Sequence, residues 1–94
     1  MMSEIPKDLD KLSPEEVDKE ILRIGMIAEL DAVNLYEQLA AKTSSDDIKK
    51  ILLDIAKEEK THVGEFQELL LRIDKEQVQE LEAGKKEVEE ELAK

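Results

Sequence analysis

Between residues 46 and 73, apolar residues recur every three or four positions, and this spacing restricts the possible folds more than any other feature of the chain. Such spacing places a continuous apolar seam along one face of a helix. The seam consists of Ile48, Leu52, Ile55, Glu59, His62, Phe66, Leu69 and Ile73, and only the glutamate and the histidine in its middle are ionisable. Residues 46–73 are therefore predicted to form one long amphipathic helix.

Residues 13–42 show the same periodicity, but on two faces. One seam comprises Val17, Ile21, Ile24, Ala28, Leu35 and Leu39, and the other comprises Leu22, Met26, Glu29, Val33, Tyr36 and Ala40. Ser13 is placed to cap this helix, Pro14 fits its first turn, and Glu16 completes a capping box. Residues 43–47 are rich in capping side chains and predict a tight turn between two antiparallel helices.

The rest of the chain adds little to this hairpin. Residues 1–12 are predicted to be an N-terminal extension. Asp74 and Gln77 form a further capping pattern, which predicts a shorter third helix over residues 75–82. Gly84 is expected to interrupt that helix and to leave residues 85–94 as a charged tail. A chain of 94 residues then makes a single all-α domain.

The two seams of residues 13–42 cannot both be covered within one hairpin. An apolar helix face that lacks an intramolecular partner predicts burial against another subunit. We therefore expect the hairpin to associate with a second copy of the chain through this leftover face.

Composition excludes several classes of function. The chain has 14 Lys and Arg against 25 Asp and Glu, and a net charge of −11 disfavours nucleic-acid binding and attracts cations. It has no cysteine, so thiolate catalysis and cysteine-ligated metals are excluded. No apolar run is long enough for a membrane span, and the first residues do not form a secretory signal. A cytoplasmic protein is expected.

The ionisable members of the seams are Glu29, Glu59 and His62, and they point to metal binding. A Glu-x-x-His spacing alone is weak evidence, because a histidine on an apolar face is usually a hydrogen-bonded core residue. In an antiparallel hairpin that turns near residue 44, however, Glu29 lies opposite position 60, level with the other two. Unpaired carboxylates are costly inside an apolar seam, and carboxylates with an imidazole suit iron or manganese. Di-metal bundles use four carboxylates and two histidines, so one chain supplies half of such a site.

Three further residues leave two interpretations open. Tyr36 lies two turns after Glu29 on the same face, where it could hydrogen-bond a ligand carboxylate or simply pack in the core. Asp31 and Glu58 lie off the seams and could guide cations inward or form ordinary solvated surface.

Residues 28–37 (AELDAVNLYE) and 58–66 (EEKTHVGEF) resemble the encapsulated ferritins, short ferritin-like proteins housed inside encapsulin nanocompartments. The resemblance extends over residues 21–81. It implies that two hairpins dimerise into a four-helix, ferritin-like bundle, and that five such dimers form an open ring. It also implies a ferroxidase with a di-iron centre, two ions per dimer, at the interface of the two hairpins. The oxidised iron would accumulate as a mineral inside the shell. Some archaeal members of the family are fused to the shell protein.

Carried over by position, the resemblance makes Glu29, Glu59 and His62 the catalytic iron ligands, with Glu59 as the bridge. Tyr36 would lie beside the centre as a second shell, and Asp31 would match one acid of a metal entry site. Family members can carry Glu and Trp where this chain has Ala28 and Leu35, a departure that bears on the entry site.

Two other functions remain as alternatives. One is a non-catalytic helical assembly module whose buried acids fix the register of the helices. The other is a different di-metal enzyme, such as a rubrerythrin-like peroxide reductase. The second is disfavoured because the chain lacks the cysteines of a rubredoxin-type centre.

Overall fold

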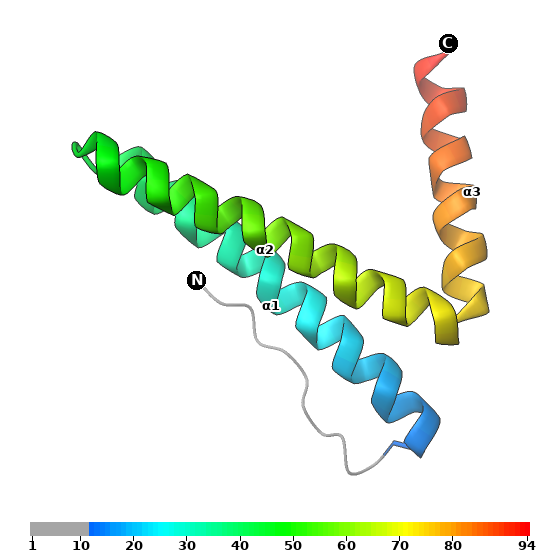
Figure 1. The fold of residues 1–94 in the computed structure, drawn as a ribbon. Coiled ribbons are helices and arrows are strands. Elements are labelled where there is room, and N and C mark those ends of the chain that lie inside the picture. Colours follow the sequence, from blue (N-terminus) through cyan, green and yellow to red (C-terminus); the bar gives the residue numbers. More distant parts are fainter. Residues whose placement is uncertain (1–11) are drawn as a thin grey trace.

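The computed structural model describes residues 12–94, and within this range the chain forms three α-helices and no strand (Figure 1). The helices are α1 (Pro14–Lys42), α2 (Asp46–Ile73) and α3 (Lys75–Leu92). The predicted all-α hairpin with a third helix is confirmed. The predicted N-terminal extension lies outside the described residues except for its last position. None of the described helices is apolar over enough of its length to cross a bilayer.

Side chains next to each helix start explain where α1 and α2 begin. The Ser13 hydroxyl accepts a hydrogen bond from the backbone N–H of Glu16 at 3.3 Å, and the Ser45 hydroxyl accepts one from Ile48 at the same distance. Each bond satisfies one of the N–H groups that a helix start leaves without a backbone partner. In the turn, the Thr43 hydroxyl accepts a further bond from the Ser45 N–H at 3.1 Å.

α1 and α2 run antiparallel beside each other (Figure 1). Only a thin strip of side chains is buried between them. The buried apolar residues are Val33 and Ala40 on α1 and Ala56 and Leu70 on α2. The α1 pair belongs to one predicted seam, so that seam faces α2. A core of this size cannot cover the apolar surface that both helices carry.

The seam of α2 faces α1 over only part of its length, which differs from the simplest expectation for a hairpin. Ile48, Leu69 and Ile73 are all exposed, whereas Ala56 and Leu70 are buried. Each buried residue follows a seam member by one position, so the line of closest contact with α1 is turned away from the seam. Part of the α2 seam therefore faces away from α1. We call this exposed side, with Ile48, Leu69 and Ile73, the open face of the hairpin.

α3 leaves the end of α2 and projects away from the hairpin (Figure 1). It begins at Asp74, a buried residue whose Oδ1 accepts a hydrogen bond from the Gln77 N–H at 3.0 Å. The other oxygen, Oδ2, accepts a bond from Arg23 Nη2 of α1 at 3.2 Å. This carboxylate therefore caps α3 and also ties the start of α3 to α1.

The predicted interruption at Gly84 is wrong, because α3 continues through this glycine to Leu92. Gly84 has no positive φ angle. A mid-helix glycine costs about 1 kcal/mol relative to alanine, and the flanking Glu, Lys and Leu residues are strong helix formers. Helix propagation is cooperative, so this cost does not end the helix. No residue of α3 is buried.

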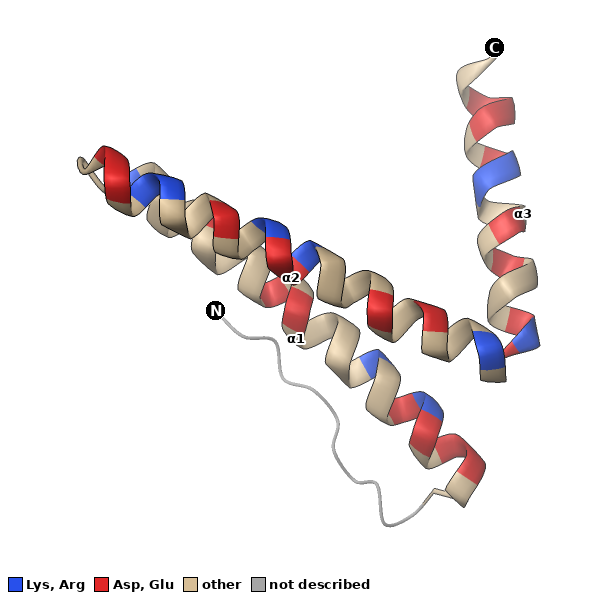
Figure 2. Ribbon diagram, in the orientation of Figure 1, with Lys and Arg blue, Asp and Glu red and all other residues tan. Residues whose placement is uncertain are grey.

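Acidic residues are distributed along all three helices, with Lys and Arg between them (Figure 2). The first turn of each helix carries acids, which are Glu15 and Glu16 in α1, Asp46 and Asp47 in α2, and Glu76 in α3. Negative charge at these ends complements the helix dipole. The overall field attracts cations to the surface of the hairpin.

Candidate metal centre

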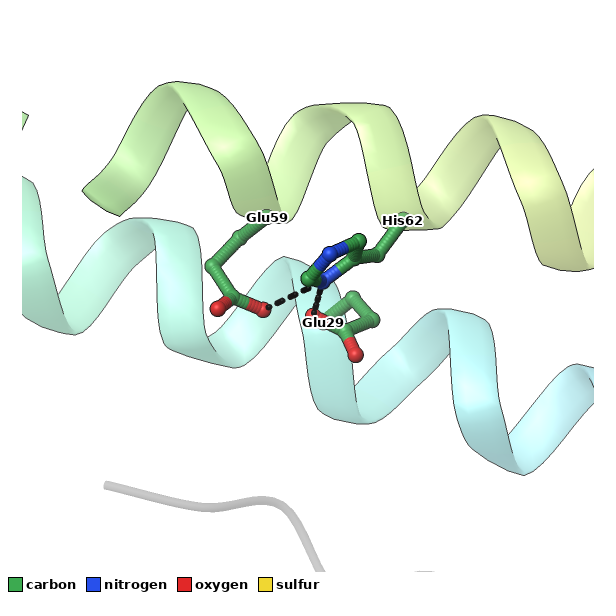
Figure 3. A group of neighbouring side chains, drawn as sticks. All are labelled: Glu29, Glu59 and His62. Carbon is green, nitrogen blue, oxygen red and sulfur yellow. Dashed lines mark ion pairs between the residues drawn. The ribbon is translucent and has the colours of Figure 1, made fainter. Parts of the chain in front are cut away.

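Glu29, Glu59 and His62 converge in the middle of the hairpin (Figure 3). Glu29 comes from α1, whereas Glu59 and His62 lie one turn apart on α2. His62 Nδ1 is 3.4 Å from Glu29 Oε2 and 3.4 Å from Glu59 Oε2. The three donor atoms all lie within 4.8 Å of one another. The register deduced from the hairpin turn is therefore confirmed.

The three side chains differ in their contact with solvent. The side chains of Glu29 and Glu59 are 21% and 19% exposed, whereas that of His62 is 43% exposed. Glu29 Oε2 is buried and has no hydrogen-bond partner. A buried carboxylate oxygen in this condition is costly unless a proton or a cation satisfies it. This oxygen lies 3.4 Å from His62 Nδ1 and points toward the middle of the cluster (Figure 3).

The donor set fits a metal such as iron or manganese. Carboxylate oxygens and an imidazole nitrogen are hard and intermediate ligands, and together they match those ions better than soft metals. In this structure, Glu59 and His62 are placed by a rigid helix, and Glu29 reaches them from the opposite helix. The fit rests on the orphaned Glu29 oxygen and the convergence of the three donors.

The neighbouring predicted residues do not join this cluster. Asp31 lies next to the site in sequence but is not among the three converging residues. Tyr36 is half-buried, and within residues 12–94 no hydrogen bond joins its hydroxyl to a cluster member. The role of Asp31 in metal entry and that of Tyr36 as a hydrogen-bond partner of a ligand carboxylate therefore stay predictions. Glu58 is exposed.

Two features near the cluster were not predicted from the sequence. An exposed ion pair links Lys60 of α2 to Glu37 of α1 at 3.3 Å. Gly25, one turn before Glu29, lies directly against the ring of Phe66, one turn after His62. The signal that could have identified this second contact is a glycine inside an apolar helix, at the level of a large aromatic residue of the opposite helix.

Comparison with known proteins gives consistent matches. The chain matches the rubrerythrin family over residues 20–93. Its fold is similar to the crystal structure of the encapsulated ferritin domain from Pyrococcus furiosus, with a TM-score of 0.82 and 51% sequence identity over 96% of this chain and 92% of that chain.

Two longer proteins are also similar in sequence. A ferritin-like–encapsulin shell fusion protein of Pyrococcus furiosus is 57% identical over 81 residues, which make up 86% of this chain and 24% of that protein. The encapsulin nanocompartment cargo protein EncC of Myxococcus xanthus is 40% identical over 67 residues, covering 71% of this chain and 51% of that protein. This chain thus corresponds to a quarter of the first protein and half of the second.

Proposed function

Because this chain belongs to the rubrerythrin family and to the encapsulated ferritins, we propose that it is a ferroxidase. It would oxidise Fe(II) with O2 at a di-iron centre shared between two subunits. The observation that supports this most directly is the convergence of Glu29, Glu59 and His62 around a buried carboxylate oxygen that has no hydrogen-bond partner.

A second copy of the chain supplies the missing half of the site in this proposal. One chain offers two carboxylates and one imidazole, half of the ligand set that di-metal bundles use. His62, the most exposed of the three, leaves the cluster open on one side. A two-fold axis beside this opening places two identical sets face to face. The exposed apolar residues of α1 and α2 would form the surrounding interface.

The reaction proposed for this site is a balanced electron transfer. Two Fe(II) ions each lose one electron, and O2 takes both electrons with two protons and leaves as hydrogen peroxide. Glu29 and Glu59 of each subunit would hold the ions through carboxylate oxygens, and His62 would add a nitrogen donor. Anionic ligands stabilise Fe(III) more than Fe(II), so the same carboxylates favour the oxidised product.

The relatives suggest where the reaction takes place. One of them is named as a fusion to an encapsulin shell and another as an encapsulin cargo protein. By this analogy, the chain would work inside an encapsulin nanocompartment. The cytoplasmic location and the ring of five dimers are further parts of the proposal, which rest on the resemblance of the sequence to the encapsulated ferritins. Ferric iron would then leave the ring and be stored inside the shell.

Aerobic Fe(II) oxidation tests the proposal. The protein is loaded with Fe(II) without oxygen, mixed with O2, and followed by Fe(III) absorbance and O2 consumption. Replacing a group that only orients a metal ligand costs about 10- to 100-fold in metal affinity or activity. We therefore expect Glu59→Gln to lower the initial rate by at least that factor. Glu29→Gln and His62→Ala should act similarly.

Glu65→Gln is the matched control, since it removes the same charge from an exposed position on α2 outside the cluster. Its rate should equal that of the wild type. A wild-type rate no faster than that of Fe(II) in buffer would reject the ferroxidase and leave the assembly module and the peroxide reductase as the remaining interpretations. Equal rates for Glu59→Gln and Glu65→Gln would also reject the assigned site.

A further inference from the structure

Near the metal cluster, Gly25 of α1 lies directly against the ring of Phe66 of α2. Gly25 is four residues before Glu29, and Phe66 is four residues after His62. The Gly25–Phe66 contact thus lies one helical turn from the metal cluster, or about 6 Å along the helix axes. Both Gly25 and Phe66 are half-buried between the helices.

The contact leaves no space for a side chain at position 25. A Cβ atom placed there would lie 2.7 Å from Cε1 of Phe66 and 2.8 Å from both Cδ1 and Cζ. Carbon atoms in ordinary contact are about 3.5–4.0 Å apart. The φ angle of Gly25 is not positive, so its backbone conformation does not require glycine. The close approach of the Phe66 ring explains the glycine instead.

Gly64 provides an internal comparison. It lies on α2, two residues after His62, and a Cβ added there would meet nothing within 4 Å. Both are mid-helix glycines without positive φ, and both sit near the cluster. Only Gly25 is required by packing against the opposite helix.

We propose that Gly25 is a positioning residue, whose contact with Phe66 sets the separation of α1 and α2 at the level of the metal ligands. This inference rests on the proposed metal site. Glu59 and His62 belong to one helix, so their spacing is independent of the distance between helices. Glu29 comes from α1, so its distance from the other two follows that separation directly.

A side chain at position 25 that pushed the helices apart would therefore move Glu29 relative to Glu59 and His62, which keep their spacing on α2. Relief of the Cβ overlap requires the ring or the helices to shift by about 1 Å, the difference between 2.7 Å and ordinary contact. Metal–ligand distances are held to within about 0.2 Å, and a site about 1 Å too loose loses much of its function. Replacing Phe66 with a smaller residue should also remove the overlap, because it leaves room for the methyl group that Gly25→Ala adds.

Binding of Co(II), a probe that O2 does not readily oxidise at such a site, tests this inference without relying on turnover. Co(II) is titrated into wild type, Gly25→Ala and Gly64→Ala, and its visible absorption gives both affinity and coordination geometry. We expect Gly25→Ala to bind at least about tenfold more weakly, with an altered spectrum, in line with losses for displaced ligands. Gly64→Ala should match the wild type. Circular dichroism at the same temperature reports whether each variant is folded.

A second pair of variants keeps the test decisive if Gly25→Ala does not fold. Phe66→Leu is compared with Gly25→Ala/Phe66→Leu, in a double-mutant cycle. We expect the added methyl to have little effect on Co(II) affinity when the ring is absent. An equal loss in both backgrounds, or wild-type affinity in Gly25→Ala, would overturn the positioning role.

The outcomes also separate this inference from the proposed ferroxidase. If the wild type binds Co(II) but oxidises no Fe(II), the enzyme proposal fails and the positioning role stands. If Glu59→Gln loses Co(II) while Gly25→Ala keeps it, the site stands and the positioning role fails. A wild type that binds no Co(II) would overturn both.

Discussion

The α1–α2 hairpin and α3 are both strongly helical, yet they differ in what they bury. Among the described residues, the hairpin contains all four buried apolar ones and the metal cluster. α3 buries none of its 18 residues, and Asp74 at its start is bonded to Arg23 of α1. Within the described chain, a continuous helix therefore does not imply a packed one.

The difference shows that helix formation and burial are decided by different parts of the sequence. Caps, helix formers and the absence of proline determine where each helix runs. Burial needs a second apolar surface, which the hairpin provides only along a thin strip. The face with exposed Leu69 and Ile73 on α2, like the far half of α3, has no apolar counterpart among residues 12–94.

The largest expected effect comes from introducing a charge on the open face of the hairpin. Leu69 shares the α2 seam with Glu59 and His62 and is 53% exposed in a single chain. Losing a buried leucine costs about 2 kcal/mol or more, and a symmetric dimer loses it twice. Leu69→Glu should therefore weaken dimerisation by about 4 kcal/mol or more, roughly a thousandfold in Kd. Sedimentation or native mass spectrometry across a dilution series measures the change.

Val88→Glu is the counterpart on α3, where Val88 is 57% exposed. We expect this variant to keep the dimer and its Co(II) site. If Val88→Glu gave monomers while Leu69→Glu did not, the comparison would be reversed and α3 would be the dimer interface.

Addition of Fe(II) to the wild type tests whether the dimer shares its metal site. Four converging carboxylates repel one another without cations, so dimerisation that increases with added Fe(II) would support a site shared between the subunits.

A smaller effect is expected at Asp74, where the two regions join. The Gln77 N–H bonded to this carboxylate lowers the pKa of Asp74, with Lys19 and Arg23 adding to the shift and burial opposing it. A group with a lowered folded pKa stabilises the native state above its unfolded pKa. That contribution is lost as the pH falls through the folded pKa. Asp74→Asn should thus lower thermal stability at neutral pH, and the difference from wild type should shrink in acid.

Glu68→Gln controls for the loss of an ordinary ion pair. Glu68 pairs with Arg72 at 2.8 Å one turn along α2, and both side chains are largely exposed. Exposed pairs of this kind contribute about 0.3–0.5 kcal/mol, so this variant should show little change at either pH. A constant stability difference between wild type and Asp74→Asn from neutral to acidic pH would contradict the role of the Asp74 charge.

Local sequence signals predicted most of the fold. Ser13 and Ser45 stand before periodic segments, and both cap helices in the structure. The turn between the two helices then determined the register, which places Glu29 beside His62. These predictions succeeded because capping and helical periodicity depend on neighbours within a few residues.

The features that were missed depend on how the helices meet in space. The rotation of α2 toward Ala56 and Leu70, and the contact of Gly25 with Phe66, follow from side-chain volumes on both helices. The Arg23–Asp74 ion pair joins residues 51 positions apart and leaves no periodic signal. The continuation of α3 through Gly84 was missed because one glycine was given more weight than the helix formers around it.

The smallest expected effect tests the far half of α3. Gln77 and Leu81 line an apolar groove of about 340 Å³ with Met26, Ile27 and Leu70, so the first turns of α3 still touch the hairpin. Removing residues 85–94 takes away only exposed positions and should change the free energy of unfolding by no more than about 0.5 kcal/mol. Co(II) affinity should be unchanged, and chemical denaturation followed by circular dichroism measures the stability. A loss of several kcal/mol in the truncated chain would show that the far half of α3 is buried in the assembled protein, and that both regions need a second subunit to complete their packing.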